Sequence, residues 1–161
     1  MNVIQARLLR LLRVPVVVAC SLGLFISTGP VYAGGVVNAT SGGVAIQGYD
    51  PVAYFTMGKP VKGTKEFAHE WLDVTWQFSS AEHRDLFVAD SIMYAPQHGG
   101  FCSVGAVDGG QYATDPKAWR IVDGKLYLFY DNATAAGWNP DNPAVVKADE
   151  DWLKTLSALP Q

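Results

Sequence analysis

The chain has 161 residues, of which 49% are hydrophobic, with 12 basic and 15 acidic side chains and two cysteines. This length supports one compact domain and is short for two. The net charge of −3 at pH 7 excludes a strongly basic surface. We therefore expect no nucleic-acid partner, because binding to phosphates requires a basic stripe or patch.

The first 33 residues differ in composition from the rest of the chain. Three arginines and no acidic residue precede an apolar run from Val14 to Ile26, and the segment ends at Val31-Tyr32-Ala33. A basic start, a short apolar run and a small-residue cleavage site are typical of a secretory signal peptide. We therefore predict cleavage after Ala33, a periplasmic or secreted protein, and no membrane association once the signal has been removed.

The same segment leaves two alternatives open. Leucines among the arginines lengthen the apolar stretch toward a retained anchor, although the run itself is shorter than a membrane-spanning helix requires. Val17-Val18-Ala19-Cys20 resembles a lipobox, which would leave a lipid-anchored Cys20. The apolar character continues through Phe25, however, where a lipoprotein normally turns polar.

Removal of residues 1–33 changes the numbers that matter for function. The predicted mature chain has 128 residues and a net charge of −6, because three of the 12 basic residues and none of the 15 acidic ones are lost. Cys20 is lost as well, so Cys102 becomes an unpaired thiol in an exported protein. The mature chain therefore forms no internal disulfide, and we predict a single domain over residues 34–161 that depends on its hydrophobic core.

Local signals predict a short helix and a hairpin early in this domain. Residues 44–46 suit a short strand. Asp50-Pro51 provides an N-cap and a first-turn proline for a helix through Phe55. Residues 66–71 and 74–78 alternate apolar and polar side chains, which predicts two paired strands with His69 on the first of them.

A second helix is predicted to follow the hairpin. Ser79 stands three residues before Glu82, which is the spacing of a capping box, and the helix should run to about Ala89. His83 and Phe87 are four residues apart and share a face of it, so His83 should point inward. Residues 90–100 are predicted to form an irregular loop.

The last third of the chain predicts one more hairpin between two helices. Asp115-Pro116 indicates a short helix toward Trp119. Strands over 120–122 and 125–130 flank Asp123-Gly124, a strong hairpin signal. Asn142-Pro143 begins a final helix with one apolar stripe, formed by Val145, Ala148, Trp152 and Leu156. We therefore predict an α+β fold: a small antiparallel sheet built from hairpins, with short helices and a C-terminal helix packed on it.

One set of residues has the potential for metal or redox chemistry. His69, His83 and His98 all precede Cys102 within 34 residues. Thiolate and imidazole ligands suit Cu(I) or Zn(II), and His98 and Cys102 are close enough in sequence to chelate one ion together. Cys102, His98, His83 and His69 are the predicted metal ligands, and no organic cofactor is indicated.

Each of these residues also has a purely structural interpretation. His69 suits a cross-strand contact, His83 a hydrogen bond from a buried helix face, and Cys102 a small buried apolar side chain. The sequence contains no phosphate-binding loop and no Gly-x-Ser-x-Gly elbow, and a cysteine hydrolase would need His and Asn or Asp brought to Cys102. An enzyme is therefore not predicted.

The hairpin and helix carry a resemblance to a known family. Residues Trp76-Gln77-Phe78-Ser79-Ser80-Ala81-Glu82-His83, followed by Phe87, Asp90 and Tyr94, resemble the signature of YHS domains. Residues 48–55, 94–102 and 122–128 are similar to an exported bacterial branch of that family. The resemblance covers nearly the whole mature chain, with a YHS-like core at about 44–105 followed by the C-terminal hairpin and helix over 106–161.

The resemblance implies a role in handling soft metals. YHS domains resemble metal modules of heavy-metal and copper proteins, in which paired cysteines are ligands, whereas Ser79 and His83 stand at those positions here. Some members of the exported branch have selenocysteine at the position of Cys102, which implies that the reactivity or the metal affinity of that atom is used. We expect an exported protein that binds copper or another heavy metal through Cys102 and the histidines. The alternatives are a thiol-redox protein, with Cys102 as nucleophile toward a redox partner protein, and a non-catalytic interaction module.

Overall fold

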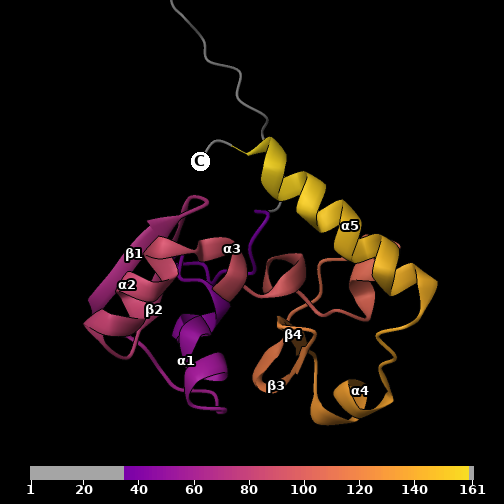
Figure 1. The fold of residues 1–161 in the computed structure, drawn as a ribbon, viewed down its shortest axis with the longest axis horizontal. Helices are drawn as coiled ribbons and strands as arrows, with labels where there is room; N and C mark the ends of the chain where they lie inside the picture. The colour runs from indigo at the N-terminus through magenta and orange to yellow at the C-terminus, as the bar shows by residue number, and fades with distance from the viewer. Residues whose placement is uncertain (1–34, 160–161) are drawn as a thin grey trace, which may run out of the picture. The chain divides into compact units, whose positions relative to one another are not determined.

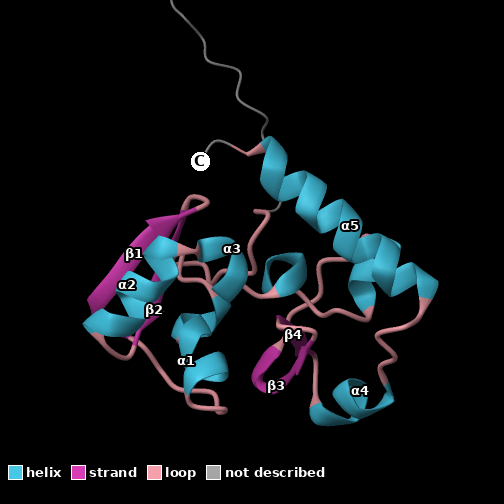
Figure 2. Cartoon of the chain, viewed as in Figure 1, coloured by secondary structure: helices cyan, strands magenta, loops and turns pink. Residues whose placement is uncertain are grey.

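The computed structural model describes residues 35–159, which fall within one compact unit. The predicted signal peptide and its cleavage site lie outside the described residues. The described part has two separate antiparallel hairpins and five α-helices, which confirms the predicted α+β class (Figure 2). In chain order, the elements are η1 (Ile46–Gly48), α1 (Pro51–Thr56), β1 (Thr64–Trp71), β2 (Val74–Phe78), α2 (Ala81–Ala89), α3 (Ser91–Tyr94), η2 (Gln97–Gly100), η3 (Gly105–Asp108), β3 (Asp115–Val122), β4 (Lys125–Phe129), α4 (Asn132–Gly137) and α5 (Pro143–Ala158).

The first hairpin and the first helix form as predicted. β1 and β2 pair around a turn at Leu72 and Asp73, both of which have positive φ. Asp50 caps α1 by accepting hydrogen bonds from the backbone N–H groups of Val52 and Ala53. The helix α2 packs on both strands of this hairpin, and α1 and α3 pack on α2 (Figure 1).

The start of α2 differs from the predicted capping box. Ser80 rather than Ser79 is the N-cap, and its hydroxyl accepts a hydrogen bond from the N–H of His83. Ser79 instead donates both its N–H and its hydroxyl to the carboxylate of Asp50. A long-range contact therefore displaces the predicted local one.

Two other predictions about local structure are wrong. The predicted loop after residue 89 contains a helical turn, α3, capped by Asp90. The predicted helix at Asp115-Pro116 is the start of β3, in which Trp119 is paired with Leu128 of β4. Asp115 does accept from the N–H of Lys117, but this Asx turn sits at an irregularity of the strand and does not start a helix.

The strand β4 joins two hydrophobic cores, because successive side chains of a strand point to opposite faces. Leu126 and Leu128 belong to the core that also contains Trp76, Phe78 and Phe87. On the opposite face of β4, Tyr127 and Phe129 pack with Ala118, Ala135, Trp138 and Val145. This arrangement explains the uninterrupted apolar sequence of β4.

The C-terminal helix α5 forms where predicted. Asn142 caps it by accepting from the N–H of Ala144. α5 packs on η2 and η3, and its buried residues are Val145, Asp149, Trp152 and Leu156. An aspartate therefore lies within the apolar stripe. Among residues 35–159, none of the helices has the length and apolar character of a membrane span.

Candidate functional site

His98 lies in an unusual backbone turn. His98, Gly99 and Gly100 have φ values of 56°, 65° and 79°, so three consecutive residues adopt left-handed conformations. This conformation is unfavourable for a residue with a side chain, at a cost of about 1–2 kcal/mol for His98. Gly99 is required by its surroundings, because a Cβ there would lie 1.9 Å from the carbonyl oxygen of Val36. The turn holds His98 against α5.

The imidazole of His98 lies between an acidic group and a hydroxyl group. Its Nε2 is 3.0 Å from Oδ1 of Asp149, and its Nδ1 is 3.4 Å from the hydroxyl of Ser103. The contact with Asp149 has the distance of an ion pair, but neither Nε2 nor Oδ1 is aligned for a hydrogen bond. His98 is 8% exposed and Asp149 7%, so the pair is shielded from solvent.

Asp149 is held by two further groups. Its Oδ2 accepts hydrogen bonds from the hydroxyl of Tyr127 at 2.6 Å and from Nζ of Lys125 at 2.8 Å. Burial by itself raises the pKa of Asp149, but the contacts with His98, Lys125 and Tyr127 outweigh it and lower that pKa to about 2. Burial, and then the bond to Asp149, raise the pKa of Tyr127. Asp149 is therefore a carboxylate at neutral pH.

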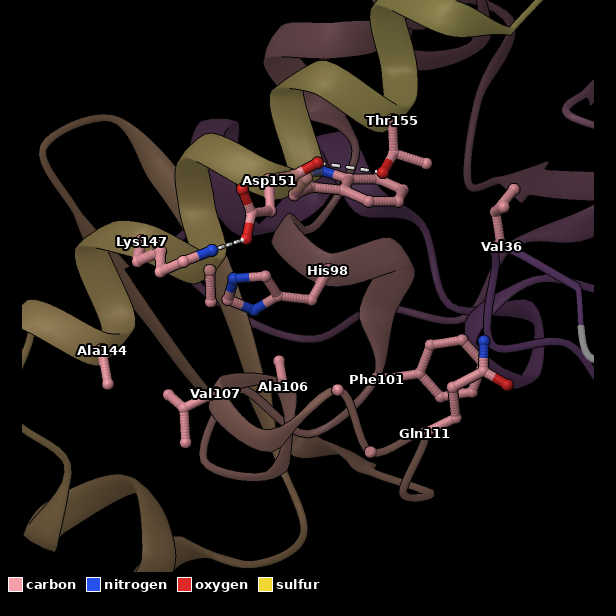
Figure 3. Close-up of a pocket in the computed structure, with 14 residues that line it drawn as sticks. Val36, His98, Phe101, Ala106, Val107, Gln111, Ala144, Lys147, Asp151 and Thr155 are labelled. Carbon is pink, nitrogen blue, oxygen red and sulfur yellow. Dashed lines mark hydrogen bonds and ion pairs between the residues drawn. The ribbon is translucent and has the colours of Figure 1, made fainter.

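A pocket of about 410 Å³ lies beside His98, between α5 and the segment that follows Phe101. One wall is a stripe of α5 at helical spacing, with Ala144, Ala148 and Trp152 as apolar members. Lys147, Asp151 and Thr155 lie along α5 on one side of His98, and Phe101, Ala106 and Val107 lie on the other (Figure 3). We refer to this space as the α5 pocket.

The opposite flank of α5 borders a smaller pocket of about 220 Å³. Asp149 and Tyr127 line it, together with exposed apolar residues of α5, Val146 and Leu153. His98 lines the α5 pocket and Asp149 lines the smaller one, so the contact between their side chains connects the two flanks of α5.

His83 belongs to a different network. Its Nδ1 is 2.6 Å from Oδ2 of Asp50, a fully buried carboxylate, and 3.3 Å from the hydroxyl of Ser79. Its Nε2 lies 3.1 Å from the hydroxyl of Thr56 at the end of α1. The side chain of His83 points inward, as the predicted helix face required, and the network joins α1 to the beginning of α2.

His69 and Cys102 occupy positions without such a network. His69 is paired with Trp76 across the first hairpin, and its ring lies 6.5 Å from that of Phe87. Cys102 is a free thiol, 5% exposed, whose backbone is fixed by a hydrogen bond from its N–H to the carbonyl of Tyr112. The thiol is therefore largely shielded from solvent.

The described residues do not gather the predicted metal ligands. Within residues 35–159, no three His, Cys, Asp or Glu side chains are grouped so that they could hold a metal ion. Both ring nitrogens of His83 and of His98 are within contact distance of protein oxygens. A metal site built on Cys102 and the histidines stays a prediction from the sequence.

Asp149 and Thr56, which contact the two histidines, are not among the site residues predicted from the sequence. Asp149 has a signal that could have identified it, because it lies four residues after Val145 and three before Trp152, on the buried stripe of α5. A charged residue on such a stripe needs a partner. Thr56 has no comparable signal, because its contact with His83 joins two separate helices.

Comparisons with protein-family models, with curated proteins and with solved structures found no match. The resemblance to YHS domains therefore stays a prediction.

Proposed function

We propose that this domain is a binding module and that the α5 pocket holds a small, neutral, largely apolar molecule with a planar ring. The observation that carries the proposal is the pocket itself, which has a buried histidine fixed between its two walls. Export of the protein, predicted from the N-terminal segment, is part of the same proposal.

The size of the pocket favours a small molecule. Its volume of about 410 Å³ lies in the range of about 300–1,000 Å³ that is typical of small-molecule sites. The flat surface of a partner protein would leave such a pocket unfilled, whereas a molecule of one or two fused rings would fill it.

The walls favour an apolar ring. Phe101 and Trp152 both line the pocket, together with Val36 and Val107. Aromatic side chains offer flat apolar surface to a planar ligand, on which offset stacking or edge contacts add to the burial of apolar area. His98 is the one imidazole among the lining residues and provides a polar edge beside these apolar side chains.

The charges at the pocket favour a neutral ligand. Nζ of Lys147 is paired with a carboxylate oxygen of Asp151, and Lys154 pairs with the other oxygen. Both lysine side chains are more than 70% exposed, so they lie at the outer surface of α5. Asp151 therefore compensates one of the two positive charges, and the remaining one is exposed to solvent, which screens it, so a ligand with a net charge would gain little from these residues.

A fluorescence titration tests this function. N-phenyl-1-naphthylamine is neutral and apolar, with planar rings, and its emission increases in an apolar environment. We expect saturable binding to the chain without residues 1–33. Replacement of the half-buried Ala148 by Phe fills the pocket and should weaken binding at least about tenfold, since it removes the space for the ring.

Glu150→Phe is the matched control for this experiment. Glu150 lies on the opposite flank of α5, where it lines the smaller pocket. The same added side chain there should leave the affinity for the probe unchanged. Equal affinities for the wild type and Ala148→Phe, with both proteins folded by circular dichroism, would contradict the proposed function.

A further inference from the structure

We propose that Thr56 is an activated nucleophile: His83 accepts the proton of its hydroxyl, Asp50 orients His83, and the group is directed at small carboxylic esters. The three side chains lie apart from the α5 pocket, and this activity does not depend on the function proposed above. The geometry that carries the inference is the line of contacts from Asp50 through His83 to Thr56.

Asp50 fixes both the position and the tautomer of His83. Its carboxylate is fully buried and accepts hydrogen bonds from the N–H groups of Val52 and Ala53 and from Ser79. In its 2.6 Å contact with His83, the carboxylate oxygen can only accept, so Nδ1 of His83 carries the proton. In a neutral imidazole this leaves Nε2 with a free electron pair, which is the form required of a general base.

Nε2 of His83 faces a hydroxyl that solvent can reach. The distance from Nε2 to Oγ1 of Thr56 is 3.1 Å, within the range over which a base takes a proton from a nucleophile. Thr56 is exposed at the last position of α1, whereas the side chain of His83 is only 12% exposed. The base is therefore sheltered and its nucleophile is presented to solvent, and Asp50 serves as a positioning residue behind them.

Capping of α1 does not account for this arrangement. The N–H groups of Val52 and Ala53 use Oδ1 of Asp50, whereas His83 and Ser79 use Oδ2. The hydroxyl of Thr56 also donates to the carbonyl of Val52 at 3.1 Å, so its proton must turn from that carbonyl toward Nε2 of His83 when the base accepts it. The contact between Thr56 and His83 is thus additional to the bonds that end and begin α1. A nucleophile, a base and an orienting carboxylate in contact form the constellation used in acyl transfer.

The step that follows is an ordinary acyl transfer. Oγ1 of Thr56 attacks the carbonyl carbon of the ester, and its proton passes to Nε2 of His83. The bond to the leaving alcohol breaks with its electron pair, and the alcohol takes up the proton from His83. Water then attacks the acyl-threonine and gives a proton to Nε2 of His83. The bond from the acyl carbon to Oγ1 breaks with its electron pair, Oγ1 takes the proton from Nε2, and the carboxylic acid leaves with Thr56 and His83 restored. Both half-reactions balance with water as the only co-reactant.

Acetylation by 4-nitrophenyl acetate tests this inference. The folded protein is quenched at short times, and acetylated side chains are identified by mass spectrometry of proteolytic fragments. Ser157 is the internal control, because it is exposed on α5 and donates to the carbonyl of Lys154 instead of facing an imidazole. A primary hydroxyl is less hindered than that of threonine, so the control is stringent. We expect Thr56 to be acetylated at least about 100 times faster than Ser157, the lower range for general-base assistance.

Two variants separate base assistance from simple exposure. His83→Gln should reduce the acetylation of Thr56 to about the rate of Ser157, whereas Thr56→Ser should retain fast acetylation at the same position. If His83→Gln does not fold, as judged by circular dichroism, the comparison of Thr56 with Ser157 in the wild type decides the matter. Equal acetylation of these two residues, or fast acetylation of Thr56 in a folded His83→Gln variant, would overturn the proposal.

Discussion

Nε2 of His98 lies 3.0 Å from Oδ1 of Asp149, and this contact joins a left-handed turn to the middle of the C-terminal helix. Apolar side chains such as Trp152 and Leu156 cover the same face of α5. Asp149 differs from them because its contacts depend on its charge. The docking of α5, and with it one wall of the α5 pocket, therefore depends in part on a titratable group.

Acid should weaken the domain through Asp149. Its pKa is lowered from 3.8 to about 2 by contacts with His98, Lys125 and Tyr127, which outweigh the opposing effect of burial. The stabilisation is present above the unfolded-state pKa of 3.8 and is lost as the pH falls through the folded-state pKa of about 2. Its size is about 2 kcal/mol. Urea unfolding at several pH values from 6 to about 2 measures this loss.

The variant Asp149→Asn isolates this contribution. It should be less stable than the wild type at neutral pH, because His98 and Lys125 then no longer face a carboxylate. It should also lose less stability than the wild type when the pH is lowered. Asp151→Asn is the control on the same helix, because Asp151 is an exposed residue paired only with exposed lysines. An acid dependence that is the same in the wild type and in Asp149→Asn would show that Asp149 does not have this role.

Asp50 should contribute far more to the free energy of unfolding than an ordinary helix cap does. Asp50→Ala removes the cap of α1 and leaves Ser79 and Nδ1 of His83 without a buried partner, so we expect a loss of about 3–5 kcal/mol. Asp131 caps α4 in a similar way but is fully exposed, and Asp131→Ala should cost clearly less. Free energies of unfolding from urea denaturation compare the two. Similar losses would mean that the buried contacts of Asp50 add nothing to its cap.

Local turn and cap chemistry made much of this fold readable from the sequence. Asp50-Pro51 and Asn142-Pro143 start helices as expected, and Asp123-Gly124 closes the second hairpin. Asp115-Pro116 carries the same signal but begins a strand, because pairing of Trp119 with Leu128 decides the conformation there. The local sequence contains no information about that partner.

The candidate sites were less readable for the same reason. The sequence identifies His83 and His98 as candidate site residues. Their partners Asp50, Thr56 and Asp149 come from other elements of the fold. The sequence clusters the three histidines near Cys102, whereas folding gives each of them different neighbours. The neighbours of each histidine in the fold therefore could not be inferred from its position along the chain.

The burial of Cys102 predicts a slow reaction with thiol reagents. At 5% exposure, the thiol should react with iodoacetamide far more slowly in the native protein than in urea, because the reagent needs access to the sulfur. Mass spectrometry of timed samples measures both rates. A native rate equal to or above the unfolded rate would favour the thiol-redox alternative over a packing role.

The metal prediction has its own measurement. If Cys102 provides the thiolate of a soft-metal site, the chain without residues 1–33 should bind Cu(I), and Cys102→Ser should weaken binding at least about tenfold, since thiolate is the preferred ligand of this ion. Competition with a chromophoric Cu(I) chelator measures the affinity. Ser157→Ala, which changes an exposed hydroxyl on α5, is the control and should leave the affinity unchanged. Affinity that is unchanged in Cys102→Ser would remove Cys102 from any copper site.

The turn at His98 should be far less tolerant of side chains than another glycine with the same backbone conformation. Gly99 has a φ of 65° and Gly109 a φ of 71°, so alanine meets similar left-handed strain at both positions, about 1–2 kcal/mol. A Cβ at Gly99 would also lie 1.9 Å from the carbonyl oxygen of Val36, whereas at Gly109 nothing lies within 4 Å. The N–H of Asn38 donates to the carbonyl of Gly99, so the clash would also disturb the pairing of the segment that includes Val36. We therefore expect Gly99→Ala to lose about 1–3 kcal/mol more stability than Gly109→Ala in urea unfolding, the range for overpacking.

Gly99→Ala should also weaken the binding of N-phenyl-1-naphthylamine, because Val36 and His98 both line the α5 pocket. Equal stability of the two variants would show that the turn at His98 can move away from Val36 at no cost.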